Sequence, residues 1–536
     1  MDLGGMLART ATAYPRRVAL DLDGRKYTYS EIDHLASAFA LGLRSIGVRP
    51  GGRVAILLGN SLEFVVAYFG AVRAGAAAVP LNTFLTAPEL AYILKDSGAD
   101  VLVSSPDFGT RLGALRKDGA IKLLVVTGGP GGKAAPEDAI PFDSLLGQPA
   151  GPATVPGIIG DRGKTGSPDG GVDTAEDSPA AILYTSGTTG HPKGAILTHR
   201  NLISNATACA EAFRITKRDR FLLFLPMFHA FSLTVCLLLP FSVGARVFVL
   251  PSVKPFSKVI KAVVLGRITF FVAIPGVYNI LSMKKFPRLL MRLLPLRLCV
   301  SGAAPLPGET LERFTKNFPF PLLEGYGLTE TSPVVSVNPR DGVCKPGSVG
   351  LPVPGVLVRI VDEAGLVLPA GHVGEITVRG PNVMRGYLGN DAATAETIRD
   401  GWLFTGDMGY RDEEGYIFIA DRKKDLIIVH GMNVYPREVE EVIYQHPAVK
   451  DAAVIGVCEP GHGEAPKAFV TLRDGASATD RDIRNFVKAR LAPYKVPRQV
   501  EVVESLPTSP TGKILKKELR RLVAAAADAG HCEAGE

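Results

Sequence analysis

Apolar positions in the first 150 residues follow two alternating patterns, one typical of helices and one typical of strands. After Ser30, which we expect to cap a helix, apolar side chains recur at helical spacing, at Ile32, Leu35, Phe39 and Leu43. Apolar runs of strand length follow at 54–58, 76–81 and 101–103. Because strands that alternate with helices build βαβ units, this part of the chain predicts an α/β fold with doubly wound parallel sheets.

The pattern changes after residue 345. Short β-rich runs predict a small β-barrel-like region, at 356–361, 375–379 and 416–420. A charged string follows at 421–425, and a compact pattern of helix, two strands and helix begins near Pro436. We therefore expect a large N-terminal domain over 1–421, a small α+β C-terminal domain over 422–523 and a disordered tail over 524–536.

One stretch raises the question of a membrane span. Residues 221–244 contain no formally charged side chain and are long enough to cross a bilayer. Proline, serine, threonine and histidine interrupt the stretch, so we expect a buried strand, loop and helix instead. The N-terminus lacks a basic region followed by an apolar one, which favours a cytoplasmic location over export.

The composition narrows the function only slightly. The chain has 536 residues, is 46% apolar and carries a net charge of +7. Acidic and basic residues are mixed along the sequence, and no basic helix interleaved with aromatic residues indicates nucleic-acid binding. The six cysteines form no Cys-x-x-Cys pair, so neither a zinc site nor a disulfide framework is indicated.

The most informative segment reads Tyr-Thr-Ser-Gly-Thr-Thr-Gly-His-Pro-Lys-Gly-Ala, at 184–195. Its small and hydroxyl residues leave backbone N–H groups free to surround an anion, and Lys193 adds a fixed positive charge. These residues are Thr185, Ser186, Gly187, Thr188, Thr189 and Gly190. The segment is not a Walker A loop, because two residues separate Gly190 from Lys193. It is either a phosphate cradle or a plain flexible loop.

Four other segments place small or charged residues where a strand or a rigid loop is expected to end. Ser301–Leu306 and Glu324–Thr331 each follow an apolar run, at the end of a strand where α/β sheets bind ligands. Residues 402–407 end in the carboxylate of Asp407, and residues 507–513 end in Lys513. Taken singly, Asp407 could cap a turn and Lys513 could be an ordinary solvated lysine.

In this order, the segments resemble the adenylate-forming superfamily of acyl-CoA synthetases, adenylation domains and firefly luciferase. The resemblance extends from about residue 5 to 522. It rests on the phosphate loop, the His229 segment, Glu-Gly-Tyr-Gly-Leu-Thr-Glu at 324–330, Thr-Gly-Asp at 405–407, Asp-Arg-Lys-Lys-Asp at 421–425 and Thr-Gly-Lys at 511–513. Within the superfamily, residues 325–333 and 431–440 look most like bacterial long-chain fatty acid CoA ligases.

The resemblance implies a two-step activation of a carboxylic acid that uses ATP, Mg²⁺ and CoA. The carboxylate attacks the α-phosphate of ATP to give an acyl-adenylate and pyrophosphate, and the thiol of CoA then displaces AMP. Lys513 would bridge the carboxylate and the α-phosphate, and Lys193 with the 185–190 backbone would hold the other phosphates. Thr185 and Glu330 would lie near Mg²⁺, which prefers oxygen ligands.

The resemblance also implies a nucleotide pocket and a mobile small domain. Asp407 would accept the ribose hydroxyls with help from Arg422, and the other nucleotide contacts would come from Gly302, Ala303, Ala304, Glu324, Gly325, Tyr326, Gly327 and Thr329. Lys424 matches a hinge, Gly431 would approach the pantetheine channel, and His229 matches a gate at the acyl junction. Ile428 stands where some members carry a lysine that assists the second step, so the contacts to CoA are less defined.

We expect a medium- to long-chain fatty acid as the substrate, because the acyl side near 273–278, Gly302 and Val334 carries no charge. Alternatives are a short-chain, branched or aromatic acid, a carrier protein in place of CoA, and a non-catalytic lipid-binding protein of this fold. Residues 284–297 mix five basic side chains with Leu, Met and Phe, which could give peripheral contact with the inner face of a membrane. The oligomeric state is open, and a homodimer is one possibility.

Overall fold

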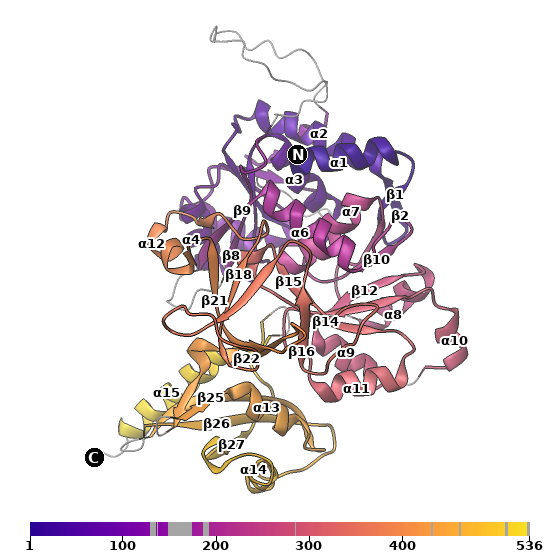
Figure 1. Ribbon diagram of the computed structural model, residues 1–536. Coiled ribbons are helices and arrows are strands. Elements are labelled where there is room, and N and C mark those ends of the chain that lie inside the picture. Colours follow the sequence, from indigo (N-terminus) through magenta and orange to yellow (C-terminus); the bar gives the residue numbers. More distant parts are fainter. Residues whose placement is uncertain are drawn as a thin grey trace.

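The computed structural model describes residues 1–128, 136, 138–147, 174–185, 192–253, 255–284, 286–429, 432–459, 463–509 and 513–532. Figure 1 shows a large part, coloured indigo to orange, above a small orange and yellow part at the C-terminal end. Two sheets form the framework of the large part, and a three-stranded and a two-stranded sheet lie in the small one.

The first sheet has the order β19-β9-β8-β4-β3-β5-β6-β7. Its centre is parallel, from β8 to β6, as the alternating pattern predicts. β9 runs antiparallel to β8 and pairs Lys193 with Thr185 across the two strands. The bounds are β3 Arg53–Leu57, β4 Ala77–Pro80, β5 Val101–Ser104, β6 Leu123–Val126, β7 Ile140–Pro141, β8 Pro179–Thr185, β9 Lys193–Thr198 and β19 Gly386–Tyr387.

The second sheet begins with six parallel strands in the order β1-β11-β10-β12-β13-β14. Their starts lie along one edge and their carboxyl ends along the other. The bounds are β1 Val18–Leu22, β10 Arg220–Leu223, β11 Arg246–Val249, β12 Phe270–Ala273, β13 Leu298–Ser301 and β14 Leu322–Gly327, with β2 Arg25–Thr28 antiparallel beside β1.

The predicted β-barrel-like region is an antiparallel continuation of this second sheet. From β14 the order runs β15-β16-β22-β21-β18-β17, with β20 beside β21. The bounds are β15 Val334–Val337, β16 Ser348–Pro352, β17 Leu357–Val361, β18 Gly374–Arg379, β20 Ile398–Arg399, β21 Trp402–Arg411 and β22 Ile417–Arg422. The change from parallel to antiparallel at β14 brings Asp407 on β21 close to the carboxyl ends of the parallel strands.

The helices of the large part pack on these sheets around a large apolar core, and α4 and α5 form a second, smaller core against the first sheet. They are α1 Leu3–Ala13, α2 Tyr29–Ser45, α3 Leu62–Arg73, α4 Ala87–Ser97, α5 Gly109–Lys117, α6 His199–Ala212, α7 Leu239–Val243, α8 Phe256–Leu265, α9 Pro275–Ser282, α10 Arg288–Leu293, α11 Gly308–Asn317 and α12 Asp391–Thr397. Short helical turns are η1 Pro106–Phe108, η2 Phe142–Leu145 and η4 Thr329–Thr331.

The cap of α2 corrects one expectation. Thr28, not Ser30, is the N-cap, and its hydroxyl accepts a hydrogen bond from the backbone of Glu31 at 3.2 Å. The carboxylate of Glu31 accepts in turn from the backbone N–H of Thr28 at 2.6 Å. These reciprocal hydrogen bonds satisfy the backbone N–H groups of both residues, whereas a capping hydroxyl alone satisfies one. The helix therefore starts two residues earlier than expected.

Residues 221–244 form the buried strand, loop and helix expected from their interruptions. β10 is followed by η3 Ser232–Leu238, a π-helix, and then by α7. All seven side chains of η3 are buried. Among the described residues, no helix is both long and apolar enough to cross a membrane.

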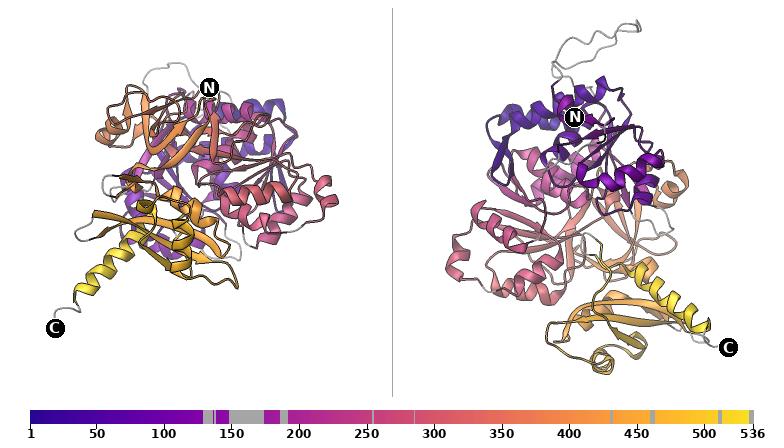
Figure 2. Two further views of the ribbon diagram at one scale, coloured as in Figure 1. Left: turned by 60° about the horizontal axis from the view of Figure 1, so that its bottom comes forward. Right: turned by 180° about the vertical axis from the view of Figure 1, so that it is seen from behind.

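The small part has its own apolar core. Its elements are η5 Lys423–Asp425, β23 Ile427–Val429, β24 Met432–Val434, α13 Pro436–Tyr444, β25 Val449–Glu459, β26 Gly463–Leu472, α14 Asp480–Lys488, η6 Pro493–Lys495, β27 Gln499–Val502 and α15 Lys516–Cys532. α15 continues beyond residue 523, where we expected the domain to end, so the backbone of 524–532 is helical. Figure 2 shows this yellow helix extending from the small part toward the C-terminus.

Candidate active site

Lys193 and Thr185 lie on either side of the phosphate loop. The strand pairing of β8 with β9 sets them opposite each other. The ammonium of Lys193 lies 5.3 Å from the ring centre of Tyr387 on β19. The hydroxyl of Tyr387 donates a hydrogen bond to Oε1 of Glu330 at 2.9 Å. β9, β19 and η4 therefore place the ammonium of Lys193 and the carboxylate of Glu330 in contact with the same side chain, that of Tyr387.

Asp407 is the centre of a second polar group. Its side chain is buried, and Oδ2 accepts a hydrogen bond from the hydroxyl of Tyr326 at 2.6 Å. Oδ1 forms an ion pair with Nε of Arg422 at 3.2 Å. Arg422 is the register partner of Asp407 across β21 and β22. A buried carboxylate flanked by two donors has a fixed orientation and keeps acceptor capacity for hydroxyl groups.

Lys513 comes from the small part and lies beside the Asp407 group. Burial and then the charge of Arg422 lower the pKa of Lys513 to about 8, although Asp407 acts in the opposite direction. The backbone on either side of the lysine is tied by hydrogen bonds to Ser509, at 3.1 Å and 2.7 Å. Lys513, the last residue of the Thr-Gly-Lys motif, thus lies close to Asp407, the last residue of the Thr-Gly-Asp motif.

His229 lies close enough to Lys513 for the two side chains to interact electrostatically. Burial and then the positive charge of Lys513 lower the pKa of His229 to about 4, so the imidazole is neutral near pH 7. Its Nδ1 accepts a hydrogen bond from the backbone N–H of Phe231 at 3.3 Å. Because the imidazole is neutral, Lys513 and not His229 carries the positive charge of this pair.

The segment after β13 has little side-chain bulk. A Cβ added at Gly302 would lie 2.9 Å from the ring of Phe231, so the glycine allows that ring to approach the backbone. Ala303 is exposed and has a φ of 68°, which non-glycine residues rarely adopt, and Ala304 is partly buried. Local strain of this kind is concentrated at ligand sites.

The predicted nucleotide residues on β14 differ in their surroundings. Glu324 is buried, its Oε1 accepts from the backbone N–H of Leu306 at 2.9 Å, and Arg437 lies 4.0 Å away. Burial raises the pKa of Glu324 to about 7, against the charge of Arg437. Gly325 and Gly327 are closely packed, since a Cβ at Gly327 would lie 2.0 Å from the carbonyl oxygen of Pro333. These contacts give Glu324 and Gly327 structural roles.

The remaining predicted residues fall into two groups. Thr329 lies in η4 and is partly buried, and Lys424 is exposed in η5, between the large part and the small one. Ser186, Gly187, Thr188, Thr189, Gly190 and Gly431 lie outside the described residues. The pairing of Thr185 with Lys193 still fixes where the 186–190 loop begins and ends.

Two residues of the site were missed by the sequence interpretation. Tyr387 joins Lys193 to Glu330, and Arg437 faces Glu324 while its backbone N–H donates to Asp421 at 2.7 Å. The run at 380–390, rich in glycine and asparagine, was a signal for Tyr387. Arg437 lies within the 431–440 segment that carried the resemblance, but its contact with Glu324 could not be read from the sequence, because the two residues are 113 positions apart (437 − 324).

The residues fit Mg²⁺ better than a metal held by protein ligands alone. Within the described ranges, no group of three or more His, Cys, Asp or Glu side chains could hold a metal ion. Glu330 and Thr185 offer only oxygen atoms near the phosphate loop. Mg²⁺ is held in such sites by one or two carboxylates, waters and substrate phosphates, so this sparse set matches it.

Comparison with known proteins agrees with this geometry. The chain matches the family described as AMP-binding enzyme over residues 7–388, and the AMP-binding enzyme C-terminal domain over residues 438–513. It is 36% identical to a long-chain-fatty-acid–CoA ligase of Bacillus subtilis (strain 168), over 96% of this chain and 94% of the relative. It is 37% identical to a feruloyl-CoA synthase of an Amycolatopsis species, over 97% and 98%.

Solved structures show the same likeness over the whole chain. The ATP-bound crystal structure of MatB from Rhodopseudomonas palustris is 33% identical, has a TM-score of 0.86, and covers 97% of this chain and 99% of its own. A benzoate CoA ligase from Burkholderia xenovorans LB400 is 30% identical, with a TM-score of 0.85 and coverage of 97% and 100%. The chain belongs to the family of AMP-binding enzymes and is an AMP-forming acid–thiol ligase, an adenylate-forming acyl-CoA ligase that uses ATP, Mg²⁺ and CoA.

Proposed function

We propose that the enzyme makes acyl-CoA from medium- to long-chain fatty acids. The observation that carries this proposal is the apolar contact between Gly302 and the ring of Phe231, two residues after His229. Val334, which is expected on the acyl side from the sequence, and its neighbour Val335 are buried and apolar. His229 is itself neutral near pH 7. An apolar wall without a fixed charge favours an aliphatic chain over an amino acid or a dicarboxylate. The relative from Bacillus subtilis is consistent with this substrate class.

Positive charge is what the adenylation step needs most, because a carboxylate and a triphosphate repel each other. Lys513 would hold the carboxylate and the α-phosphate in line, and Lys193 with the 185–190 loop would hold the phosphates that leave. Support comes from the electrostatic interactions of Lys513 with Asp407 and Arg422 and with His229. Little covalent chemistry is then left for the protein beyond orientation and electrostatic stabilisation.

The nucleotide would lie along the carboxyl ends of β13 and β14. Asp407 would accept hydrogen bonds from the ribose hydroxyls beside Arg422, and Gly302, Ala303, Ala304 and Tyr326 would line the adenine slot. Glu330 and Thr185 would hold Mg²⁺, which supplies positive charge to the phosphates when bound. The fixed Tyr326–Asp407–Arg422 contacts support this arrangement, because they orient the acceptor before the ligand arrives.

The small part would rotate between the two steps. Lys424, exposed in η5 next to Arg422, would be the hinge, and Gly431 would then approach the pantetheine arm of CoA. The position of Lys513 near Asp407 corresponds to the orientation for adenylation. The rotation would withdraw Lys513 and open access for the thiol.

A panel of acids tests the substrate class. AMP and pyrophosphate release would be measured with straight-chain acids of two to eighteen carbons, benzoate and ferulate, each with and without CoA. We expect the highest kcat/KM for acids of eight carbons or more, and CoA-dependent turnover. A preference for acetate or benzoate would refute the fatty acid proposal, and AMP release that ignores CoA would point to a carrier protein as acceptor.

An aromatic acid is the second candidate, because the feruloyl-CoA synthase is as similar to this chain as the fatty acid ligase is. The same panel separates the two. Ferulate and benzoate would have to exceed all straight-chain acids for this candidate to replace the first.

Peripheral membrane contact through 284–297 is a further proposal. Leu293 of α10 is 72% exposed and the nearby Met283 is 63% exposed, which supports an apolar contact. Arg297 does not take part, because Asp219 holds its guanidinium. Leu293→Ser should reduce sedimentation with anionic vesicles at low salt, whereas unchanged sedimentation would refute a role for α10.

A further inference from the structure

An arginine lies at or just before the start of five neighbouring parallel strands of the second sheet. In the order β13, β12, β10, β11 and β1, these residues are Arg297, Arg267, Arg220, Arg246 and Arg17. Parallel strands lie about 4.8 Å apart and start at the same edge, so residues distant in sequence form one row. Arg220 and Arg246 are direct partners in the register of β10 and β11. We call these five residues, together with Arg218, the arginine edge.

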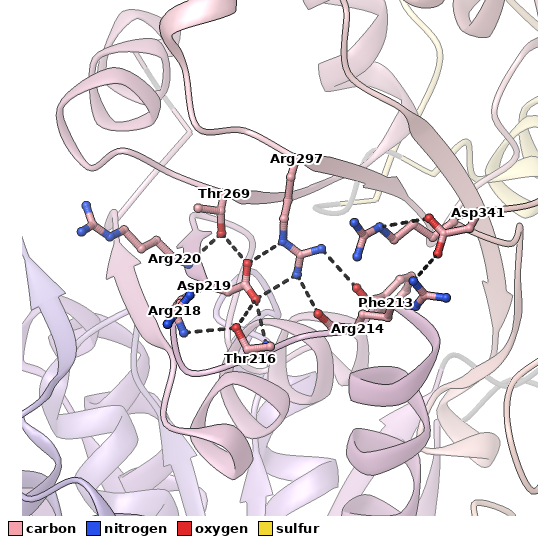
Figure 3. A network of polar contacts seen from close by, with 10 residues as sticks. Phe213, Arg214, Thr216, Arg218, Asp219, Arg220, Thr269, Arg297 and Asp341 are labelled. Carbon is pink, nitrogen blue, oxygen red and sulfur yellow. Dashed lines mark hydrogen bonds and ion pairs between the residues drawn. The ribbon is translucent and has the colours of Figure 1, made fainter.

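Two carboxylates neutralise only two of these arginines. Asp21 pairs with Arg246, and Asp219 pairs with Arg297 at 2.7 Å. Figure 3 shows Arg297 reaching Asp219, which also accepts hydrogen bonds from Thr216 and Thr269, while the guanidinium of Arg220 points away from it. Asp219 is therefore fully engaged in joining the starts of β10, β12 and β13.

The other four arginines form no ion pair with any described carboxylate. They are Arg17, Arg218, Arg220 and Arg267, of which Arg220 is partly buried and the rest are exposed. A pocket of about 380 Å³ lies between the loops, and Arg17, Arg218, Arg220 and Arg246 line it. Asp219, already paired, is the one acidic residue among its lining residues.

Positive charge in this pocket is concentrated enough to be unfavourable in the absence of an anion. Burial, and then Arg246, Arg267 and Arg17, lower the pKa of Arg220. The buried Nε of Arg246 has no hydrogen-bond partner among the described residues. Like charges on paired strand positions repel, and Arg220 and Arg246 occupy such positions, with Arg218 beside them and Arg17 just before β1. The guanidinium groups of Arg17 and Arg220 donate to the backbone carbonyl oxygens of Gly244 at 3.2 Å and of Gly266 at 3.4 Å, contacts that do not neutralise their charge.

We propose that this pocket of the arginine edge binds a phosphate monoester. Guanidinium groups match the oxygens of phosphate with paired hydrogen bonds, and a dianion would offset the uncompensated charge. The pocket lies at the starts of β10 and β11, whereas Gly302 and Tyr326 lie at the carboxyl ends of β13 and β14. The two sites are therefore at opposite edges of the sheet, and the proposal does not rest on the proposed function.

The phosphate has two possible sources, a small metabolite in solution or the head group of an anionic lipid. Two probes carry the same phosphate monoester in these two forms: glycerol 3-phosphate, and phosphatidylcholine vesicles that contain phosphatidic acid. Binding would be measured with the full chain at low salt, by titration calorimetry and by co-sedimentation. We expect the wild-type protein to bind at least one probe, and to leave vesicles of phosphatidylcholine alone unbound.

Paired variants separate this pocket from general surface charge. Arg218→Ala with Arg220→Ala should weaken binding by roughly tenfold or more, since it removes two of the four guanidinium groups that line the pocket. Arg484→Ala with Arg490→Ala removes the same charge from exposed positions on and after α14 and should leave binding unchanged. Circular dichroism and turnover of octanoate should match the wild type in both double variants.

Each outcome of these binding measurements either supports the proposal or overturns it. Vesicle binding alone would assign a lipid head group, and binding of glycerol 3-phosphate would assign a free phosphate ligand. Absence of binding to either probe, or equal binding by the wild type and the Arg218–Arg220 double variant, would overturn the proposal.

Discussion

At the scale of single residues, Lys513 is the side chain whose proposed role depends most directly on its charge. Its ammonium lies among Arg422, Asp407 and His229, and burial lowers its pKa to about 8. His229 is neutral near pH 7, so the two do not compete for the same role. A lysine with this pKa is a cation at neutral pH but loses its proton in the mildly alkaline range.

A pH profile tests the charge of Lys513. Because the proposed role needs the ammonium, kcat/KM for ATP–pyrophosphate exchange should fall as the pH rises through about 8. In Lys513→Arg the alkaline limb should leave the accessible range, since an arginine has a pKa above about 12. An alkaline limb that stays at the same pH in this variant would show that another group titrates.

Removal of the Lys513 side chain tests its place in the reaction. Lys513→Ala should abolish pyrophosphate exchange while thioester formation from supplied acyl-adenylate and CoA continues at near the wild-type rate. The reason is that, in the proposed rotation, the small domain would carry Lys513 away before the second step. Equal loss of both half-reactions would contradict the proposed rotation.

At the scale of elements, the turn between β14 and β15 determines how the Glu-Gly-Tyr-Gly-Leu-Thr-Glu motif is presented. Gly327 lies against Pro333, and the pairing of β14 with β15 shifts register between Tyr326 and Gly327. Tyr326 is thereby directed to Asp407, and Glu330 to Tyr387. The glycine therefore matters to the motif through backbone packing.

Gly327→Ala tests this packing. Its methyl group would lie 2.0 Å from the Pro333 carbonyl oxygen, so the two strands must separate. We expect a loss of about 2–4 kcal/mol in the free energy of unfolding and at least a tenfold fall in pyrophosphate exchange. Gly276→Ala is the matched control, because no atom lies within 4 Å of its added Cβ. Equal stability of the two variants in urea denaturation would refute the packing argument.

At the scale of the whole molecule, few contacts hold the small part over the site. Nη2 of Arg473 contacts both carboxylate oxygens of Glu309 on α11 at 3.0 Å. The backbone N–H of Gly308 donates to Glu441 of α13, and Arg437 faces Glu324. Most of these contacts are polar and partly exposed, so the interface can separate without exposing a large apolar surface.

Arg473→Ala tests whether the ion pair with Glu309 favours the adenylation orientation. A partly exposed pair contributes about 1 kcal/mol at most, so pyrophosphate exchange should slow by roughly twofold to fivefold. Thioester formation from supplied acyl-adenylate should be unchanged or faster. Arg490→Ala, in the same domain but distant from α11 in sequence and contacts, serves as the control. A uniform slowing of both half-reactions would show that the pair only stabilises the fold.

The local pattern of the chain predicted most of the elements and supplied the candidate site residues. Strand and helix spacing predicted the parallel sheets, because burial of one face imposes a period on the sequence. Motif order was enough to select Lys193, Glu330, Asp407 and Lys513. The helix cap was misassigned because Thr28 and Ser30 are both hydroxyl residues, and only the contacts of Glu31 distinguish them.

Only the tertiary structure decided which distant residues meet. Tyr387 and Arg437 are linked to the site by contacts between separate elements, and their partners are far away in the chain. The arginine edge appears in the sequence as an even mixture of charges, because Arg220, Arg246, Arg267 and Arg297 are 21–30 residues apart and Arg17 lies near the N-terminus. Parallel pairing aligns the starts of the strands, and that alignment gathers the scattered charges into one pocket.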